Sequence, residues 1–363
     1  MKSKIRVAIA GVGNSTSALI QGIEYYKDFM KKNSSKDVVP GLAHPTIGNY
    51  TLDDIEFVAA FDINKRKIGK DLAEAIFEPP NCVTRFSNVR RLGAEVHPGP
   101  ILDGVDKHTE EAFLPYGKEI KPVDVSKVLE LSNADLLINY LPVGSSNATR
   151  FYANEALSAG CAFINAIPEF VASDESWGEK FKKANLPLAG DDVKSQLGAT
   201  ILHRRIVELF VRRGVAIDET YQLNIGGDTD FLNMTKEDRL KTKRVSKTNA
   251  VLSLIPYEVS TRIGPSDYVS FLRNTKIAYI YIKGRNFGER PVVVELKLSV
   301  EDSPNSAGVM IDVIRAVKIA LDKGISGPLI SVSAYAFKHP PVNVSDDMAL
   351  DWFNKFISGE RDI

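Results

Sequence analysis

The chain has 363 residues, and its 46 basic and 46 acidic side chains cancel in formal charge. This balance excludes a global electrostatic pull toward nucleic acid or an anionic membrane, but it leaves a local anion site open. The length and a hydrophobic content of 44% predict a sizeable core and two domains, or one large domain with an insertion, while the two cysteines predict free thiols and no structural zinc.

The N-terminal stretch MKSKIRVAIAGVGN begins with basic residues and then turns apolar, as a secretion signal does. The apolar run stops at a Gly-x-Gly-Asn break, which fits a first strand better than a signal peptide. No apolar run elsewhere approaches the ~20 residues that a membrane-spanning helix needs. We therefore expect a cytoplasmic protein without a membrane anchor.

The first predicted unit is a strand, a glycine turn and a helix. The strand is RVAIAG (6–11), and the helix is SALIQGIEYY (17–26), whose apolar residues recur at helical spacing. A polar connection with proline and glycine (27–50) follows and is predicted to be a loop insertion. The next strand is EFVAAFD (56–62), which ends in an acid.

Strands and helices then alternate up to about residue 195. Strands are predicted at DLLINYLP (135–142), CAFINAIPEF (161–170) and LPLAGDD (186–192), and a helix is predicted between the first two of them. An amphipathic helix lies within VKSQLGATILHRRIVELFVRRG (193–214). This alternation predicts a doubly wound α/β domain of the Rossmann type.

The pattern changes in the second half of the chain. IAYIYIKG and VVVELKLSVED alternate with period two around the turn RNFGERP (285–291), which predicts an antiparallel hairpin. A helix follows (303–324), and then a strand-like LISVSAYAF (329–337). We predict an NAD-binding domain from 1–194 and 303–363, with an inserted α+β catalytic and oligomerisation domain (195–302) built on a largely antiparallel sheet.

The glycine turn after the first strand indicates a dinucleotide site. Gly11 permits a tight turn, and Gly13 lets backbone N–H groups approach a pyrophosphate, but Thr16 stands where the third glycine of the fingerprint is expected. Asp62 ends the next strand, where an acid accepts hydrogen bonds from a ribose and disfavours a 2′-phosphate. The sequence thus favours NAD over NADP, although Asp62 could instead cap the turn that follows it.

A second candidate site lies at GDDVKSQLGAT (190–200), just before the amphipathic helix. Free N–H groups at a helix start, with the Ser195 and Thr200 hydroxyls nearby, form a cradle for phosphate. A plain helix start capped by serine would explain Ser195 as well, but it would not explain the two preceding acids. The stretch therefore favours an anion site.

Lysines are concentrated in KTKRVSKTNA (241–250). Lys243 and Lys247 are four residues apart, so a helix would place both ammonium groups on one face, where their repulsion is relieved by an anion or by solvent. Lys276 and Lys338 occur in or beside apolar segments, and a buried lysine is costly unless it is paired or functional. The stretch is either a solvated basic face or part of an anion site.

Several blocks follow one another in order between residue 6 and about residue 341, namely VAIAGVGNSTSALIQGIEYY, VAAFDINKRKIGKDL, INYLPVGS, PLAGDDVKSQLGAT, LNIGGDTDFLNM, KRVSKTNAV, IGPSDYV and EDSPNSAGVMIDVIRAVKIA. Together they resemble the myo-inositol-1-phosphate synthase family, in its shorter bacterial and archaeal form.

The resemblance implies an isomerase that converts D-glucose 6-phosphate into 1L-myo-inositol 1-phosphate with a retained NAD. C5 would be oxidised, C6 would lose a proton, the enolate would close on C1, and C5 would be reduced again. Such an enzyme would serve inositol and phospholipid biosynthesis.

The resemblance also implies roles for individual residues. The cofactor would be held by Gly11, Val12, Gly13, Asn14, Ser15, Asp62, Leu141, Ala166, Asp192 and Asp230. The substrate phosphate would be bound by Ser195, Gln196, Gly198, Thr200, Lys247 and Lys276. Lys243 would act at the C5 oxygen and Lys338 at the C1 oxygen, while the groups that orient these lysines would be Asp192, Asn224, Asp230 and Asp302.

Further expectations follow from the family. A divalent or monovalent cation would be held by Asp302 and Ser303 against the cofactor pyrophosphate, with Asp230 as a further candidate ligand. The protein would be a homotetramer whose hairpin sheets pack together. The family's usual turn carries Asn where Asp228 stands. Two other functions remain open: an NAD-dependent sugar-phosphate dehydrogenase without cyclisation, and a non-catalytic NAD-binding sensor.

Overall fold

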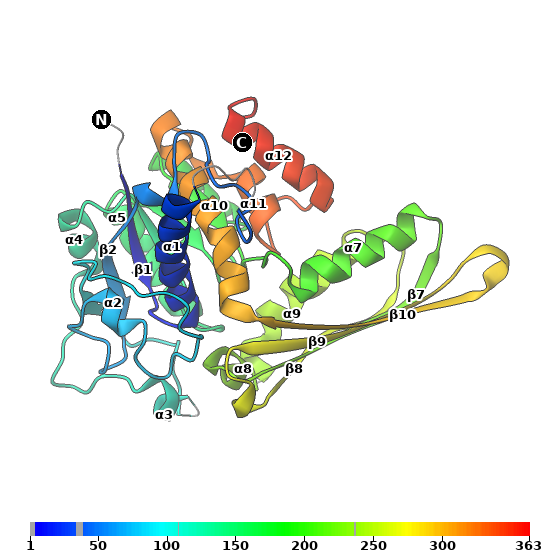
Figure 1. Cartoon of the computed structure of the whole chain (residues 1–363), viewed down its shortest axis with the longest axis horizontal. Helices are drawn as coiled ribbons and strands as arrows, with labels where there is room; N and C mark the ends of the chain where they lie inside the picture. Colours follow the sequence, from blue (N-terminus) through cyan, green and yellow to red (C-terminus); the bar gives the residue numbers. More distant parts are fainter. Residues whose placement is uncertain (1–3, 34–38, 108, 236) are drawn as a thin grey trace.

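The computed structural model describes residues 4–33, 39–107, 109–235 and 237–363, leaving aside the side chains of 237–244 and of residue 265. Two sheets organise the chain (Figure 1). The first is surrounded by helices, and the second extends away from it as a long, curved platform. Among the described residues, no helix is long and apolar enough to cross a membrane.

The first sheet has seven parallel strands in the order β11-β6-β5-β4-β1-β2-β3. Its strands are β1 (Ile5–Ala10), β2 (Ile55–Asp62), β3 (Val96–Pro98), β4 (Leu136–Asn139), β5 (Ala162–Asn165), β6 (Pro187–Gly190) and β11 (Gly327–Pro328). The order reverses between β1 and β4, so the carboxyl ends of these strands form the crevice where doubly wound domains bind ligands. The predicted fold class is confirmed.

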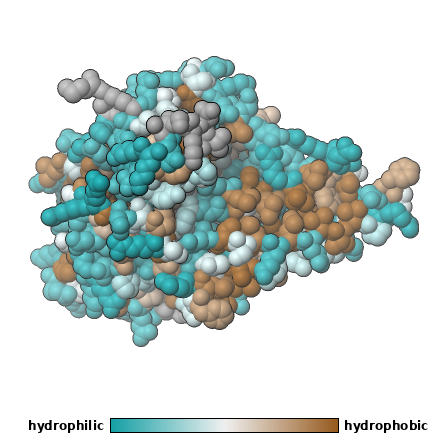
Figure 2. All heavy atoms as spheres, in the orientation of Figure 1, coloured by the Kyte–Doolittle hydropathy of each residue, from teal (hydrophilic) through white to brown (hydrophobic). Residues whose placement is uncertain are grey.

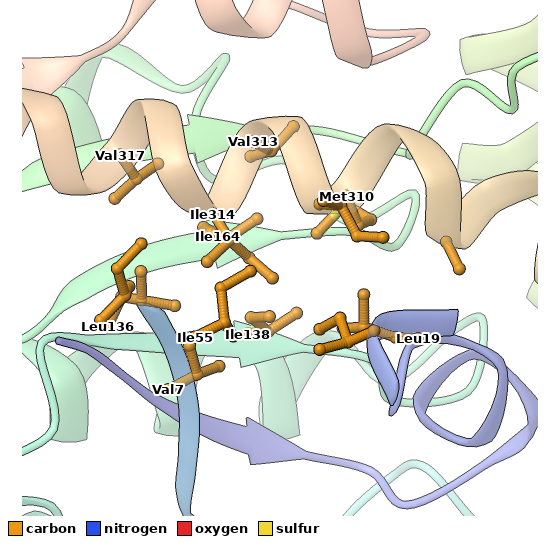
Figure 3. Close-up of a cluster of buried hydrophobic side chains, with 14 of the residues drawn as sticks. Val7, Leu19, Ile55, Leu136, Ile138, Ile164, Met310, Val313, Ile314 and Val317 are labelled. Atoms are coloured by element: carbon orange, nitrogen blue, oxygen red, sulfur yellow. The ribbon is translucent and has the colours of Figure 1, made fainter. Parts of the chain in front are cut away.

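Helices cover both faces of this sheet because its strands are apolar on both sides. One face carries α1 (Asn14–Lys32) and α10 (Asp302–Lys323). Figure 3 shows Met310, Ile314 and Val317 of α10 above the strand residues Leu136 and Ile138. All five are buried, and each contributes roughly 1.5–3 kcal/mol by leaving water. The other face packs against α4 (Val125–Leu131), α5 (Ser146–Ser158) and α6 (Glu175–Lys183).

The second sheet has the order β10-β9-β7-β8. Its strands are β7 (Ala216–Gly226), β8 (Ser260–Tyr268), β9 (Thr275–Arg285) and β10 (Pro291–Glu301). The predicted hairpin is present, since β9 and β10 pair antiparallel along their whole length. Antiparallel pairing also joins β7 to β9, whereas β8 pairs parallel to β7.

One face of the second sheet is covered by α7 (Ala199–Arg212) and α9 (Glu237–Leu252), with Val207, Ile280 and Ile282 in the shared core. Figure 2 shows a broad hydrophobic region over this part of the molecule. The face of the sheet away from the helices includes Tyr221 and Tyr281, whose rings stack 4.9 Å apart. Alternation along β7 and β9 thus produces one buried and one partly exposed apolar face.

The remaining elements connect and cover the two sheets. They are α2 (Leu72–Ala75), α3 (Glu110–Phe113), α8 (Thr229–Asn233), α11 (Ile330–Ala336), α12 (Asp346–Ser358) and three short 3₁₀ turns (Leu52–Asp54, Ser270–Leu272 and Phe287–Glu289).

Two predictions about elements were wrong. LISVSAYAF (329–337) is not a strand, because residues 330–336 form α11. The loop predicted from residue 27 starts later, since α1 continues to Lys32. Tyr26 and Phe29 pack against the main core and extend the helix beyond its strongly apolar part.

Candidate active site

The glycine turn between β1 and α1 forms the floor of a cleft. Gly11 has φ +94°, and a Cβ there would lie 2.6 Å from the Tyr140 carbonyl oxygen, so only glycine fits. At Gly13 an added Cβ would meet nothing within 4 Å, which leaves the backbone accessible to a ligand. The fully buried Thr16 takes the place of the third glycine by donating its hydroxyl hydrogen to the Gly11 carbonyl at 2.6 Å.

Asp62, at the end of β2, lies directly beside this turn. Its carboxylate accepts hydrogen bonds from the backbone of Val12 at 2.8 Å, of Ile63 at 2.7 Å and of Asn64 at 2.8 Å. Asp62 therefore braces the turn, and it also lines the cleft. The open glycine turn with an acid at its rim fits the pyrophosphate and ribose of NAD.

Two residues of this cleft were missed by the sequence analysis. Lys67 is buried and donates from Nζ to the Val12 carbonyl at 2.7 Å and to Asn81 Oδ1 at 3.0 Å. Asn81 Nδ2 donates to the same carbonyl at 3.1 Å. Burial lowers the pKa of Lys67, and the carboxylate of Asp62 acts in the opposite direction. The run of basic residues after Asp62 was visible, but the sequence does not indicate which of them turns inward.

The cleft continues into a larger one toward the second sheet, with about 970 Å³ of empty space. Residues from both sheets line it. The first sheet and its connections contribute Gly13, Asn14, Ser15, Leu141, Ala166, Asp192 and Ser195. The second part of the chain contributes Asp230, Lys276, Asp302 and Ser303, and Lys338 contributes from the segment after α11. The structure thus brings most of the predicted cofactor residues to one crevice.

A small polar pocket opens beside it at the start of α7. Its lining consists of Ser195, Gly198, Ala199, Thr200, Ile201, Gln222, Lys247, Lys276 and Lys338. Gly198 precedes the helix, and Thr200 lies in its first turn, where N–H groups have no helical partner. Lys247 reaches this pocket from α9 and is only 4% exposed. Three ammonium groups beside a helix N-terminus form a site for a multiply charged anion.

Two carboxylates engage these lysines. Asp192 accepts from Lys338 Nζ at 2.7 Å and from the Ser246 hydroxyl at 2.7 Å, which links the end of β6 to α9. Asp302 holds Lys276, with Nζ–O distances of 3.1 and 3.2 Å. Each pair lowers the cost of burying a lysine and sets the place of its ammonium group.

The two neighbouring acids in GDDVKSQLGAT, Asp191 and Asp192, have different roles. Asp191 is fully buried and accepts from the backbone N–H groups of residues 171–173, from the Ser173 hydroxyl and from Asn165 Nδ2. Its carboxylate supports the loop after β5. Asp192, by contrast, lines the cleft.

Some predicted site residues lie elsewhere. Gln196, predicted to bind the phosphate, does not line the small polar pocket; its Nε2 donates to the Gly41 carbonyl at 2.9 Å, because its side chain lies on the other side of the loop. Asn224 is 1% exposed on β7, two residues beyond Gln222. Lys243 belongs to α9, but its side chain is outside the described set. Asp228 caps α8 through the backbone N–H groups of 230 and 231 and accepts from Asn274.

The predicted cation ligands, Asp302 and Ser303, are engaged with protein neighbours. No group of three or more His, Cys, Asp or Glu side chains that could hold an ion occurs within the ranges that the structure describes. The Asp302 carboxylate is paired with Lys276, and the Ser303 hydroxyl accepts from Asn274 at 3.0 Å. The protein alone thus supplies few of the six or more oxygens that a hard cation takes, and a cation here would depend on cofactor phosphate oxygens and water for the rest.

Known proteins resemble the chain over nearly its whole length. A family model described as myo-inositol-1-phosphate synthase matches residues 198–303. An inositol-3-phosphate synthase of Corynebacterium glutamicum is 48% identical over 363 residues, covering 98% of each chain. One from Mycobacterium tuberculosis H37Rv is 48% identical over 360 residues, with 98% of this chain and 96% of the relative covered.

Solved structures agree with this fold. The crystal structure of Ari2 superposes with a TM-score of 0.80 at 33% identity, covering 98% of this chain and 99% of that one. A myo-inositol-1-phosphate synthase-related protein from Thermotoga maritima has a TM-score of 0.82 at 24% identity with 98% of each chain covered, which supports the fold alone. The chain therefore belongs to the myo-inositol-1-phosphate synthase family.

Proposed function

We propose that this protein converts D-glucose 6-phosphate into 1L-myo-inositol 1-phosphate, with NAD used and regenerated in each turnover. One observation carries the proposal: Lys247, Lys276 and Lys338 surround the start of α7 beside a cleft that continues to the glycine turn of β1. A phosphorylated hexose in that pocket would lie next to a nicotinamide in the cleft. Relatives with 48% identity that carry the synthase name support the same reaction.

The small pocket would bind the phosphate. Its helix N-terminus, the Ser195 and Thr200 hydroxyls, and the ammonium groups of Lys247 and Lys276 supply donors and positive charge on several sides. Gly198 allows close approach, because a Cβ there would already lie 3.0 Å from Ser195 Cβ. Fixing the phosphate leaves the sugar carbons to extend toward Lys338 and the glycine turn.

The remaining lysines, Lys338 and Lys243, would stabilise negative charge or accept a proton at the substrate oxygens. Lys338, oriented by Asp192, would stabilise the developing negative charge at the C1 oxygen during ring closure. Lys243 lies one helical turn from Lys247 in α9, and we assign it the C5 hydroxyl proton on the family pattern. Asp230 lines the cleft and offsets part of this positive charge.

NAD, when bound, would accept a hydride from C5 and return it after ring closure. Gly11, Gly13, Asn14 and Ser15 would hold its pyrophosphate at the start of α1, and Asp62 would bind its ribose. No step is assigned to a cation.

We further propose that the protein assembles through the open face of its second sheet into a tetramer. Leu223 is 39% exposed and Val293 50% exposed on strands β7 and β10, and Tyr221 and Tyr281 stack beside them. This face also carries charged side chains such as Lys283 and Glu219, and exposed apolar side chains on such a mixed face are covered in stable oligomers. Light scattering after size-exclusion chromatography tests this: Val293→Glu should give smaller species, and an unchanged mass would contradict it.

Product identification tests the reaction. Purified protein, NAD and glucose 6-phosphate should give an inositol monophosphate by ³¹P and ¹H NMR, with no accumulation of NADH absorbance. Sustained NADH together with an oxidised sugar phosphate would instead indicate the dehydrogenase alternative. NAD binding without turnover would indicate a sensor.

A further inference from the structure

A chain of four polar side chains is buried between α7 and β7, behind the phosphate pocket. His203 Nε2 lies 2.8 Å from the Thr220 hydroxyl oxygen, and His203 Nδ1 lies 3.3 Å from one amide atom of Gln222. The other amide atom of Gln222 lies 3.0 Å from the amide of Asn224. None of the four is more than 3% exposed, so each contact must match a donor with an acceptor.

The donor and acceptor roles along these four side chains are fixed at the Thr220 end. The Thr220 hydroxyl lies 2.7 Å from the Tyr281 backbone carbonyl oxygen. A carbonyl carries no proton, so two oxygens this close require the hydroxyl hydrogen of Thr220 between them. That hydrogen is then unavailable to His203, and His203 Nε2 must donate to the Thr220 oxygen.

The neutral ring of His203 fixes the orientation of the Gln222 amide. Burial lowers the pKa of His203 to about 4, so the imidazole has a single proton near neutral pH, and it is on Nε2. Nδ1 is therefore an acceptor, and Gln222 must face it with its NH₂ group. Amide oxygen and nitrogen are equivalent in shape, and hydrogen-bond logic decides between them.

The same hydrogen-bond argument fixes the orientation of the Asn224 amide. With its nitrogen toward His203, Gln222 presents its oxygen to Asn224, which must then donate its own NH₂ group. The outer amide atom of Asn224 becomes the oxygen. The reverse orientation sets Gln222 Oε1 against a bare ring nitrogen, and it leaves Asn224 Nδ2 as a buried donor with no partner in the described part of the chain.

Asn224 follows a residue that lines the phosphate pocket. Gln222 lines the phosphate pocket, and Asn224 follows it on the same face of β7. Asn224 pairs with Ala278, and two positions further along the strands Gly226 pairs with Lys276, another residue of the pocket. Asn224 thus lies on β7 between Gln222 and the strand partner of Lys276, and its outer amide atom is buried.

We propose that His203 and Gln222 are positioning residues that lock Asn224 with its carboxamide oxygen outward, to accept a hydrogen bond from a hydroxyl of the sugar phosphate. The inference rests on the proposed function for the identity of the ligand. An outward oxygen selects a hydroxyl and repels a phosphate or carbonyl oxygen, so it would set the orientation of the sugar as well as bind it.

Two measurements on the full-length protein test the proposal. The first is the tautomer of His203 by ¹⁵N NMR of histidine-labelled protein, where His203→Phe assigns the signals among the five histidines. We expect a neutral ring protonated on Nε2. A ring protonated on Nδ1, or on both nitrogens at neutral pH, would overturn the proposal whether or not the protein turns over glucose 6-phosphate.

The second measurement is kinetic. His203→Phe, and Gln222→Met as an alternative if the first variant does not fold, should lower kcat/KM by about 10- to 100-fold. Val207→Ala, one turn further along α7 in the same core, is the control for loosened packing and should have a much smaller effect. A loss in the control as large as that in His203→Phe would reduce the role of His203 to packing.

Substrate analogues that each lack one hydroxyl complete the test. One analogue should lose activity with the wild type but lose little more with His203→Phe, because both changes remove the same hydrogen bond. Additive losses for every analogue would refute the role of Asn224. If the wild type forms no inositol phosphate while the tautomer is as expected, the orientation of Asn224 stands and the assigned substrate class falls.

Discussion

The pairing of Lys338 with Asp192 offers the sharpest test of the site. Lys338 Nζ lies 2.7 Å from Asp192 Oδ1, and the side chains are 13% and 4% exposed. At this distance and an effective dielectric constant of about 20, the attraction is about 6 kcal/mol, most of which is offset by the cost of removing both charges from water. The pair should therefore add little net stability, but breaking it should be costly.

Replacing Lys338 with Met should affect stability and turnover separately. The variant removes the Lys338 ammonium group from beside the buried Asp192 carboxylate, and it should lose up to about 3–5 kcal/mol in the free energy of unfolding. Turnover should fall by about 10²-fold or more, since a positive charge at the developing oxyanion is missing. NAD binding should persist, because the glycine turn and Asp62 lie at the other end of the cleft.

A double variant separates the two effects. Lys338→Met combined with Asp192→Asn removes both charges, so its unfolding free energy by urea titration should return to within about 1–2 kcal/mol of the wild type. Its rate of inositol phosphate formation should stay low. If the double variant recovered turnover together with stability, Lys338 would be a structural residue and the reasoning would fail.

Three further predictions concern other parts of the molecule. Asp62→Ala releases three backbone N–H groups beside the glycine turn and should weaken NAD binding at least about tenfold by calorimetry; unchanged affinity would contradict its role. Thr200→Val removes a hydroxyl from the phosphate pocket and should raise KM for glucose 6-phosphate more than it lowers kcat, whereas an unchanged KM would place the phosphate elsewhere. Because burial lowers the pKa of His203 to about 4 from 6.5, the unfolded chain takes up a proton first as the pH falls, so stability is complete above pH 6.5 and should decline by up to about 3 kcal/mol toward pH 4. Denaturation at pH 7 and pH 4.5 should show a loss that is smaller in His203→Phe; equal losses would refute this assignment.

The fold was predictable where the pattern admits one interpretation. A strand that runs into two glycines and a helix, and a later strand that ends at Asp62, indicate a parallel sheet with a crevice at its carboxyl edge. LISVSAYAF failed because residues 331–334 are all buried, so neither period two nor period 3.6 stands out. The segment forms a helix that packs between α10 and α12, and these packing partners cannot be identified from the local sequence pattern.

The site was predictable where its residues are close in sequence. Ser195, Gly198 and Thr200 surround one helix start, and their spacing indicated the pocket. Gln196 was assigned with them, although alternate residues of a loop face different sides. Lys67 and Gln222 could not be identified, because their importance comes from tertiary neighbours that lie far away in sequence, namely Asn81 for the first and His203 for the second.

A substrate deuterated at C5 tests the central claim most directly, since the account requires that a hydrogen leave this carbon and return to it within one active site. Glucose 6-phosphate labelled in this way should give an inositol monophosphate that retains the deuterium, as measured by mass spectrometry and NMR, while no NADH accumulates. Release of deuterated NADH into solution with an oxidised sugar phosphate, or a cyclic product without the label, would contradict the account.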